Sequence, residues 1–571
     1  MSGPRAELGQ IVLLSHHFFG RMFRNETVDF EDQMKEKLVV VLSLLAVFFG
    51  WASGLLLFKY HFVPDIGRSW QEKSYIFTLM MLVFGLVTLL EWDVLFPDRR
   101  DFLNLAPLPV RWRTVFAAKL ASFVLFIGLF STAMMSLSAG LFSMYLTQWR
   151  TDTVGLAARY VAAHLAAGFV ACFAVFFAVV SLQLLLAAAL PRALLRRVST
   201  ALRFVLAAGL VFLLLSFVLA PSTLGREFQD LGALKERSDP FMFRYPPLWF
   251  VGLYEVLLGT RDPVFEAEAR TAGLCLAIGL IAFLGSAAAS YRRHVLKTLE
   301  TDRSRPARPR WREARQRLLG ATVLRSPEER AVFRFFEETL RSSPMHRMTL
   351  VYYLAAGAAG ILVLVAGYRD SFRHLTPGNG FLLVLPLLLA FTVVVGTRVL
   401  VDRPAAAEAN WVFRLTETRR IDRYAAGLKK AVIIKFLVPL FLGVLIVHAF
   451  LWAPGLALAH TGFGLLVSVL GTEAAFFRYR KVPFACTWVP GRLKLHVTAL
   501  PGLVGLMLAM MALAAAEKSA LQAAPRAAAF LAVAAAAAFG LRQGNRRFYR
   551  SAVLRFEEEP EAALIGLGSG D

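Results

Sequence analysis

Long apolar runs separated by short polar segments are the main pattern of the chain. Each run has about 20 residues or more, the length that an α-helix needs to cross a hydrocarbon core of about 30 Å. The pattern predicts an all-α, polytopic transmembrane bundle of about 12 spans. The approximate spans are 37–58, 75–95, 114–146, 156–189, 199–220 and 269–291, followed by 348–367, 380–401, 431–452, 454–475, 497–516 and 524–541.

The chain begins with a segment of a different kind. Within residues 1–36, the apolar side chains Ile11, Leu14, Phe18 and Met22 recur at helical spacing, with His17, Arg21 and Arg24 on another face. This spacing predicts an amphipathic helix that lies in the cytoplasmic headgroup layer. The alternative is a soluble N-terminal cap. No cleavable signal peptide is expected, because no clean apolar core is followed by small residues.

Composition agrees with the pattern. The chain has 571 residues, of which 57% are hydrophobic, and its mean hydropathy of +0.57 lies outside the range of soluble domains. A β-barrel is excluded because the apolar runs are continuous rather than alternating. The three cysteines are scattered, so neither a disulfide framework nor a metal site is expected.

The net charge of +23 also fits a membrane protein. Arg and Lys gather in alternate loops, among them 97–113, 191–203 and 476–494, which is the positive-inside pattern and not a sign of nucleic-acid binding. Both termini are therefore expected in the cytoplasm. The Ala, Leu and Arg bias points to a bacterial sequence, and hence to the bacterial cytoplasmic (inner) membrane as the location.

A basic, proline-rich segment divides the chain into two halves of about six spans each. It becomes helix-like from Ser326 through Arg341. The expected organisation is an amphipathic helix at 1–36, a first transmembrane half at 37–291, a basic cytoplasmic linker at 292–347, a second transmembrane half at 348–541 and a cytoplasmic tail at 542–571.

The most informative polar segment is residues 97–111, here called the first insert, which follows the second span. It combines two acids, three arginines and three prolines with apolar side chains. The prolines interrupt any helix that begins near Asp98, which predicts a short rigid protrusion suited to a groove on a soluble partner. An elbow helix lying on lipid is the alternative. The candidate docking residues are Pro97, Asp98, Arg100, Asp101, Phe102, Leu105, Pro107, Leu108, Pro109 and Arg111.

The second half contains a fainter copy of this arrangement. A span ends at Val401, a proline follows at Pro404, and a polar helical stretch leads to Lys429 at the start of the next span. Residues 409–420, here called the second insert, are the matching docking element. Its candidate residues are Asn410, Trp411, Phe413 and Arg414, although Trp is also common in the headgroup region. An internal duplication is a hypothesis that this copy supports.

Together, the amphipathic first helix, two spans, the loop with Asp101-Phe-Leu and Leu108-Pro, and a third span that begins near Lys119 resemble the permease of an ABC-2-type exporter. The resemblance implies that the first insert is the coupling helix that contacts a separate ABC ATPase subunit. ATP and Mg²⁺ would be held by that partner, and no cofactor is expected in this chain. The sequence has no phosphate-binding loop and no expected catalytic residue.

The chain departs from the commonest pattern of that family, which has six spans. Two fused half-permeases would need no second copy, so the chain can act as a monomer with two ATPase copies; the oligomeric state is left open. The alternatives are a secondary transporter, which would need buried charges or broken helices, and a polytopic membrane enzyme. Neither is favoured, because His164 and His448 look isolated, and Glu91, Asp93 and Glu473 lie near cytoplasmic span ends.

Two other segments are interpreted as structural. Residues 245–255 are rich in aromatic side chains and are expected to form a helix that anchors at the outer interface, with gating of an exit path as the alternative. The loop 481–491 contains Cys486, with His496 ten positions on. No acid is placed to orient that histidine, so a structural loop is favoured over thiol chemistry.

Overall fold

A computed structural model describes most of the chain. The described residues are 4–23, 31–62, 69–92, 110–148, 153–219, 231–236, 240–298, 310–369, 379–403, 405, 421–485 and 495–552. They are helical and contain no strand, which confirms the all-α prediction. The chain divides into two compact units, Met1–Arg303 (unit 1) and Ser304–Asp571 (unit 2). This division falls inside the expected linker at 292–347.

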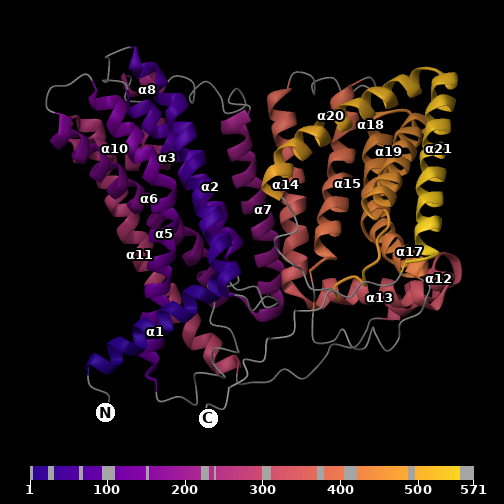
Figure 1. Cartoon of the computed structure of the whole chain (residues 1–571), viewed down its shortest axis with the longest axis horizontal. Coiled ribbons are helices and arrows are strands. Elements are labelled where there is room, and N and C mark those ends of the chain that lie inside the picture. Colours follow the sequence, from indigo (N-terminus) through magenta and orange to yellow (C-terminus); the bar gives the residue numbers. More distant parts are fainter. Residues whose placement is uncertain are drawn as a thin grey trace, which may run out of the picture. The chain divides into compact units, whose positions relative to one another are not determined.

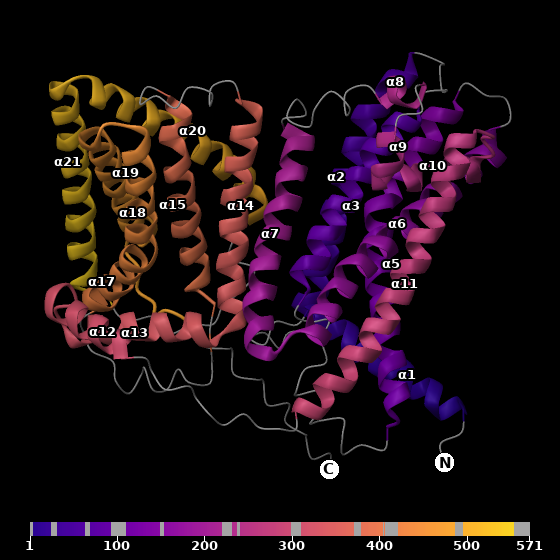
Figure 2. The ribbon, with the colours of Figure 1, turned by 180° about the vertical axis from the view of Figure 1, so that it is seen from behind.

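Unit 1 consists of long, roughly upright helices with shorter ones at their ends (Figures 1 and 2). The amphipathic helix α1 (Pro4–Phe23) is inclined to the others, and the long helices are α2 (Glu31–Leu57), α3 (Trp70–Leu90), α5 (Trp112–Thr147), α6 (Thr153–Ala189), α7 (Arg192–Leu219) and α11 (Pro263–Thr298). The shorter elements are η1 (Phe58–His61), α8 (Leu231–Glu236), α9 (Pro240–Arg244) and α10 (Pro246–Leu258).

Aromatic side chains fill the core of unit 1. Phe77 and Phe84 of α3, Phe126 of α5, Phe176 of α6 and Phe250 of α10 are all less than 2% exposed. Two helices meet closely where a small residue allows it: a Cβ on Gly50 of α2 would lie 2.9 Å from the Cβ of Leu137 in α5. Small residues of this kind let helix backbones approach one another in a membrane.

Unit 2 has two helices at one end, α12 (Arg310–Thr322) and α13 (Pro327–Ser342), and α13 lies nearly horizontal below the upright helices (Figure 1). The others are α14 (Pro344–Gly367), α15 (Gly380–Leu400), α17 (Ile421–Val432), α18 (Val438–Leu451), α19 (Pro454–Ala475), α20 (Leu495–Gln522) and α21 (Ala524–Tyr549). Between α17 and α18, the residues Ile433–Leu437 form a π-helical turn, η6, so these three elements are one continuous helix.

Eleven helices among the described residues are long and apolar enough to cross a membrane. They coincide with eleven of the twelve expected spans. The remaining one, 497–516, lies within α20, whose first part includes side chains outside the described residues. In Figure 1, α20 runs obliquely across unit 2, while α14, α15 and α21 stand upright.

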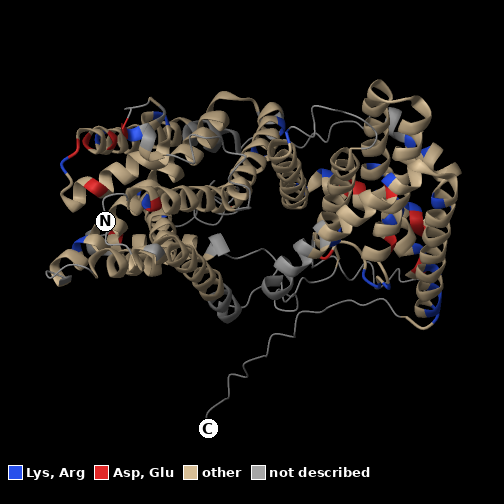
Figure 3. Cartoon of the chain, turned by 90° about the horizontal axis from the view of Figure 1, so that it is seen from above, with Lys and Arg blue, Asp and Glu red and all other residues tan. Residues whose placement is uncertain are grey.

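The surface of the long helices is apolar, as a lipid environment requires. Large hydrophobic side chains are exposed along them, for example Val47 and Trp51 of α2, Ile281 of α11 and Ile446 of α18. Seen along the helices, the ribbon is mostly uncharged (Figure 3). The chain is therefore a multi-pass membrane protein in contact with a lipid bilayer.

One expectation about unit 1 is wrong. The aromatic helix α10 is not an anchor at the outer interface, because Leu248, Phe250, Val251 and Tyr254 are completely buried. Pro246 begins the helix, and Gly259 ends it in the left-handed conformation at φ 90°. Its neighbours are α3, α6 and α11, so α10 belongs to the core of the unit.

Candidate docking elements

In unit 1, the amphipathic helix α1 packs on the first turns of α5. Phe18 is buried with Val115 and Ala118 of α5, and Ile11 and Leu14 pack against the same cluster. The predicted apolar face, as far as it is described, therefore faces protein. A second group on α1, Leu8, Val12 and Leu13, is more than 60% exposed and is available to lipid.

Two cations at the start of α5 attach it further to α1. Arg111, the residue before α5, donates through Nη1 to Glu7 Oε1 at 2.6 Å. Lys119 Nζ lies 5.9 Å from the centre of the Phe18 ring. The ion pair is exposed and adds little stability by itself. It does fix the point at which the first insert returns to the helices.

The described residue that precedes the first insert is also held. Trp92, just after α3, is 1% exposed. Its carbonyl oxygen accepts a hydrogen bond of 2.6 Å from Gln183 Nε2 of α6, and the Arg203 guanidinium of α7 lies 5.2 Å from its ring centre. The first insert therefore joins anchored residues of unit 1 on both sides.

In unit 2, α13 corresponds to α1 of unit 1, because each precedes the first span of its unit and packs on the third. Ser326 caps it by accepting a hydrogen bond from the Glu329 backbone N–H at 3.2 Å. The Glu329 carboxylate in turn accepts the Arg325 backbone N–H at 2.9 Å. This reciprocal cap, followed by Pro327, explains why the helix begins here. The apolar face of α13, with Val332, Phe333 and Phe336 buried, packs on α17.

The backbones of α13 and α17 touch at one glycine. A Cβ on Gly427 of α17 would lie 2.8 Å from the carbonyl oxygen of Glu329 and 2.9 Å from its Cα. Since backbone atoms of a packed helix cannot move away cheaply, only glycine fits at this position. The contact sets the spacing between the two helices.

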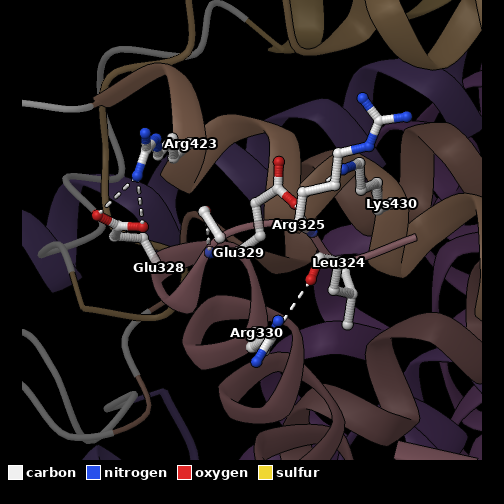
Figure 4. A network of polar contacts seen from close by, with 8 residues as sticks. Leu324, Arg325, Glu328, Glu329, Arg330, Arg423 and Lys430 are labelled. Carbon is white, nitrogen blue, oxygen red and sulfur yellow. Dashed lines mark hydrogen bonds and ion pairs between the residues drawn. The ribbon is translucent and has the colours of Figure 1, made fainter. Parts of the chain in front are cut away.

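Ion pairs surround this contact (Figure 4). Arg423 of α17 donates to both carboxylate oxygens of Glu328, at 3.3 and 3.2 Å. Lys430 donates to Glu329 at 2.8 Å. It also donates to the carbonyl oxygen of Val323 at 2.9 Å. The backbone N–H of Glu328, the Ser326 hydroxyl and Arg423 hold the pKa of the Glu328 carboxyl below its ordinary value, because they all favour the charged form.

The residues that precede the second insert are also held by hydrogen bonds. The carbonyl oxygen of Val401 accepts the Phe484 N–H at 2.9 Å, and the Phe484 carbonyl accepts the Ala405 N–H at 2.8 Å. Phe484 is 1% exposed and has a positive φ of 61°, so this part of the loop 481–491 is structural. Arg403 donates to the hydroxyl of Thr349 at 3.0 Å, and its burial lowers the pKa of its guanidinium.

The predicted docking residues themselves are mostly not described. Of the fourteen, Arg111 is the only one among the described residues, where it pairs with Glu7. The others lie outside the described residues: Pro97, Asp98, Arg100, Asp101, Phe102, Leu105, Pro107, Leu108, Pro109, Asn410, Trp411, Phe413 and Arg414. Their role as docking residues stays a prediction.

Unit 1 contains buried ionisable groups that the sequence reasoning missed. Lys73 of α3 donates to Glu255 Oε1 of α10 at 2.6 Å, and the two side chains are 1% and 9% exposed. The Lys73 ammonium also lies 4.4 Å from the centre of the Tyr254 ring. Thr260 donates to the other Glu255 oxygen at 3.0 Å. A lysine near the start of a span and a glutamate in an aromatic helix were the available signals.

The two histidines that looked isolated are not isolated. The His164 ring lies 5.2 Å from that of Phe142 and 5.4 Å from that of Tyr254, measured between centroids. The His448 ring lies 4.3 Å from Trp452 and 4.8 Å from His460. Near the opposite end of unit 2, Glu473 accepts a hydrogen bond of 2.6 Å from Lys429.

Among the described residues, no three His, Cys, Asp or Glu side chains are grouped so that they can hold a metal ion. No family model, no curated protein and no solved structure matches the chain.

Proposed function

We propose that this protein is the membrane permease subunit of an ATP-driven exporter of the ABC-2 type. In this proposal a separate ABC ATPase subunit binds the first and second inserts on the cytoplasmic side of a bacterial inner membrane. ATP and Mg²⁺ bind to that partner, and this chain is not itself an enzyme. The fused halves supply both docking elements, so one chain serves two ATPase copies.

One observation supports the proposal most strongly. In each unit, an amphipathic helix precedes the first span and packs on the start of the third span, next to the point where the insert returns. The pairs are α1 with α5 and α13 with α17. Ion pairs and buried side chains hold the described residues next to each insert. A movement of an insert would therefore displace the long membrane helix that follows it.

The exposed side of α13 also fits a partner-binding role. Arg330, Arg334 and Arg341 are exposed on it. With Glu338 as the exposed acid among these three arginines, the face opposite the packed apolar stripe has a net positive charge and suits an acidic surface. Such a surface favours fast association with an acidic partner.

Co-purification tests this proposal. The full-length chain is co-expressed with the ABC ATPase encoded beside its gene, where there is one, and captured by an affinity tag. We expect the ATPase to be captured, and the combined change D101A, L105A and L108A to abolish capture while the gel-filtration profile stays unchanged. The combined change W411A, F413A and R414A should weaken capture in the same way.

The matched control is the pair of changes E266Q and R270Q on α11. These side chains form an exposed i,i+4 ion pair at the start of α11, in neither insert, so capture should be unaffected. Unchanged capture after both insert variants would reject the docking assignment.

A secondary transporter is the second candidate. Buried charges were expected to be absent, and this expectation is wrong: Lys73 of α3 pairs with Glu255 of the shorter helix α10, and His460 pairs with Glu517 of α20, and all four side chains are buried. The two candidates differ in their energy source. If transport continues when the partner's ATPase activity is removed and stops when the proton gradient is collapsed, the second candidate replaces the first.

A further inference from the structure

Three ionisable side chains meet inside unit 2, near the turn between α18 and α19. They are His448 in the last turn of α18, His460 in the second turn of α19 and Glu517 of α20. Their relative exposures are 7%, 1% and 0%. None of them contributes to the docking elements.

The hydrogen bonds determine which atoms carry hydrogen. His448 Nδ1 lies 2.9 Å from the carbonyl oxygen of Val444, which only accepts, so this nitrogen must carry the hydrogen. His460 Nδ1 lies 2.5 Å from Glu517 Oε1, so one hydrogen lies between them. Three buried polar atoms are left without a hydrogen-bond partner: His448 Nε2, His460 Nε2 and Glu517 Oε2.

The charges of His460 and Glu517 indicate that the ligand of this site is a proton. With one hydrogen on its ring, His460 is neutral and the pair with a charged Glu517 has a net charge of −1. Trp452, whose ring centre is 5.4 Å from that of His460, belongs to a buried apolar cluster that also contains Val467 of α19 and Met510 of α20. An uncompensated charge in such a place is costly, and one further proton makes the pair neutral.

The charged side chains of the neighbouring helices do not neutralise the His460–Glu517 pair. On α20 the nearest is Lys518, and on α21 it is Arg526; both are exposed, and Arg526 donates to Gln522 at 3.5 Å. On α15 the charged side chain is Arg398, which pairs with Asp402 at the far end of that helix. On the continuous helix η6–α18, the other charged group is Lys435, in the π-helical turn.

We propose that His460 and Glu517, with His448 beside them, form a binding site for a single proton. The proton binds at His460 Nε2 and gives an imidazolium–carboxylate pair with no net charge. A second proton on His448 is disfavoured, because the two rings are 4.8 Å apart and two cations would repel each other at that distance. The site therefore takes one proton and not two.

The proton comes from the side that the α18–α19 turn faces. Ala453, Pro454 and Gly455 are exposed in that turn. His460 is six residues beyond Pro454, about 9 Å along a helix. The site therefore lies about 9 Å in from the α18–α19 turn, at the end of unit 2 opposite α13 (Figure 1). It responds to the pH on that side.

Trp452 reports directly on this site, because an imidazolium quenches the fluorescence of a nearby indole. Its ring centre is 4.3 Å from that of His448 and 5.4 Å from that of His460. The chain has ten tryptophans, so the signal of Trp452 is the difference between the wild-type protein and W452F. The experiment uses the purified full-length protein, titrated from about pH 4 to about pH 9.

We expect the Trp452 signal to fall on acidification with the steepness of a one-proton transition. H460Q should abolish the transition. E517Q should move its midpoint to lower pH by about 1 unit or more, because the imidazolium loses its anion. The matched control E473Q removes the carboxylate that pairs with Lys429 elsewhere in unit 2 and should leave the midpoint unchanged.

A Trp452 signal that does not depend on pH, a two-proton transition, or the same midpoint in E517Q would each overturn the proposal. If E517Q does not fold, nuclear magnetic resonance of the wild-type protein with ¹⁵N-labelled histidine decides. At acidic pH, one solvent-protected imidazole must carry hydrogen on both nitrogens and must lose one as the pH rises. If no protected histidine behaves in this way, the proposal is wrong.

Discussion

At the scale of single residues, the buried pair of Lys73 and Glu255 predicts a large cost when one partner is removed. Both side chains are almost completely buried, and their charged atoms are 2.6 Å apart. Moving two charges out of water is costly, so such a pair adds little net stability over apolar side chains. Removing one partner is different, because the remaining charge then loses the group that it contacts while it stays buried.

This difference gives a prediction for Glu255→Gln. We expect it to reduce the free energy of unfolding by about 3–5 kcal/mol, because the Lys73 ammonium loses its counter-charge. The measurement is the thermal midpoint of the purified protein by fluorescence-detected gel filtration. The double variant K73M/E255Q should recover most of the loss.

The control for this prediction is Glu266→Gln in α11. Glu266 pairs with Arg270 at 3.5 Å, but both side chains are about half exposed or more. Its loss should cost less than about 1 kcal/mol. Equal effects of E255Q and E266Q would contradict the assignment of Lys73 and Glu255 as a buried pair.

Sequence reasoning could not find this pair, and the reason is distance along the chain. Lys73 and Glu255 are 182 positions apart, and His460 and Glu517 are 57 positions apart. Hydrophobic periodicity places a residue on a helix, but it does not tell which helices are neighbours. Arg111 shows the opposite case: its place at the end of the first insert was evident from the sequence, while its partner Glu7 was not.

At the scale of elements, periodicity was a better guide. The face of Ile11, Leu14 and Phe18 was predicted, and these residues do lie on one side of α1. The helix-like stretch from Ser326 through Arg341 is α13, Pro327–Ser342. What periodicity missed was the surface that each face covers: α1 turns this face to α5 rather than to lipid. For α10, aromatic composition suggested an interface, but the helix is in the core.

The contact between α13 and α17 gives a prediction at this scale. Gly427→Ala places a methyl group less than 3 Å from backbone atoms of Glu329, so α13 must move away from α17. We expect a loss of about 1–3 kcal/mol in the free energy of unfolding, measured by the same thermal midpoint. Capture of the ATPase partner should weaken as well, if the packing of α13 on α17 holds the second insert in position for binding.

Gly443→Ala in α18 is the matched control. It lies on the same continuous helix, and a Cβ there would meet nothing within 4 Å. Alanine is favoured over glycine inside a helix, so G443A should be neutral or raise stability by up to about 1 kcal/mol. A loss in G443A equal to that in G427A would show that the close backbone contact is not the cause.

At the scale of the whole molecule, the two units share one order of elements. An amphipathic helix, two spans, an insert and a third span occur in unit 1 as α1, α2, α3 and α5, and in unit 2 as α13, α14, α15 and α17–η6–α18. The sequence showed this order through span lengths and loop charges. The docking role of the inserts stays a prediction, because their candidate residues other than Arg111 lie outside the described residues.

Membrane sidedness is the prediction at this scale. In unit 2, α13 and the α18–α19 turn lie at opposite ends of the upright helices (Figure 1). In a variant without the three native cysteines, we expect R334C to react with a membrane-impermeant thiol reagent only after cells are opened. G455C should react in intact cells. Reaction of both from the same side would contradict the expected orientation of unit 2.

The π-helical turn Ile433–Leu437 has a consequence for how the two halves compare. A π turn holds about one residue more than an α turn. The third span of unit 2 therefore carries one residue of extra length, while α5 of unit 1 is regular throughout. Any alignment of the halves must open a gap of one position here, and without it every later residue is compared with the wrong face of its counterpart. Deleting one residue from this turn would let it close as an α turn and leave Lys429 and Lys430 in nearly the same orientation relative to α18, whereas deleting one residue from a regular turn would rotate them by about 100°.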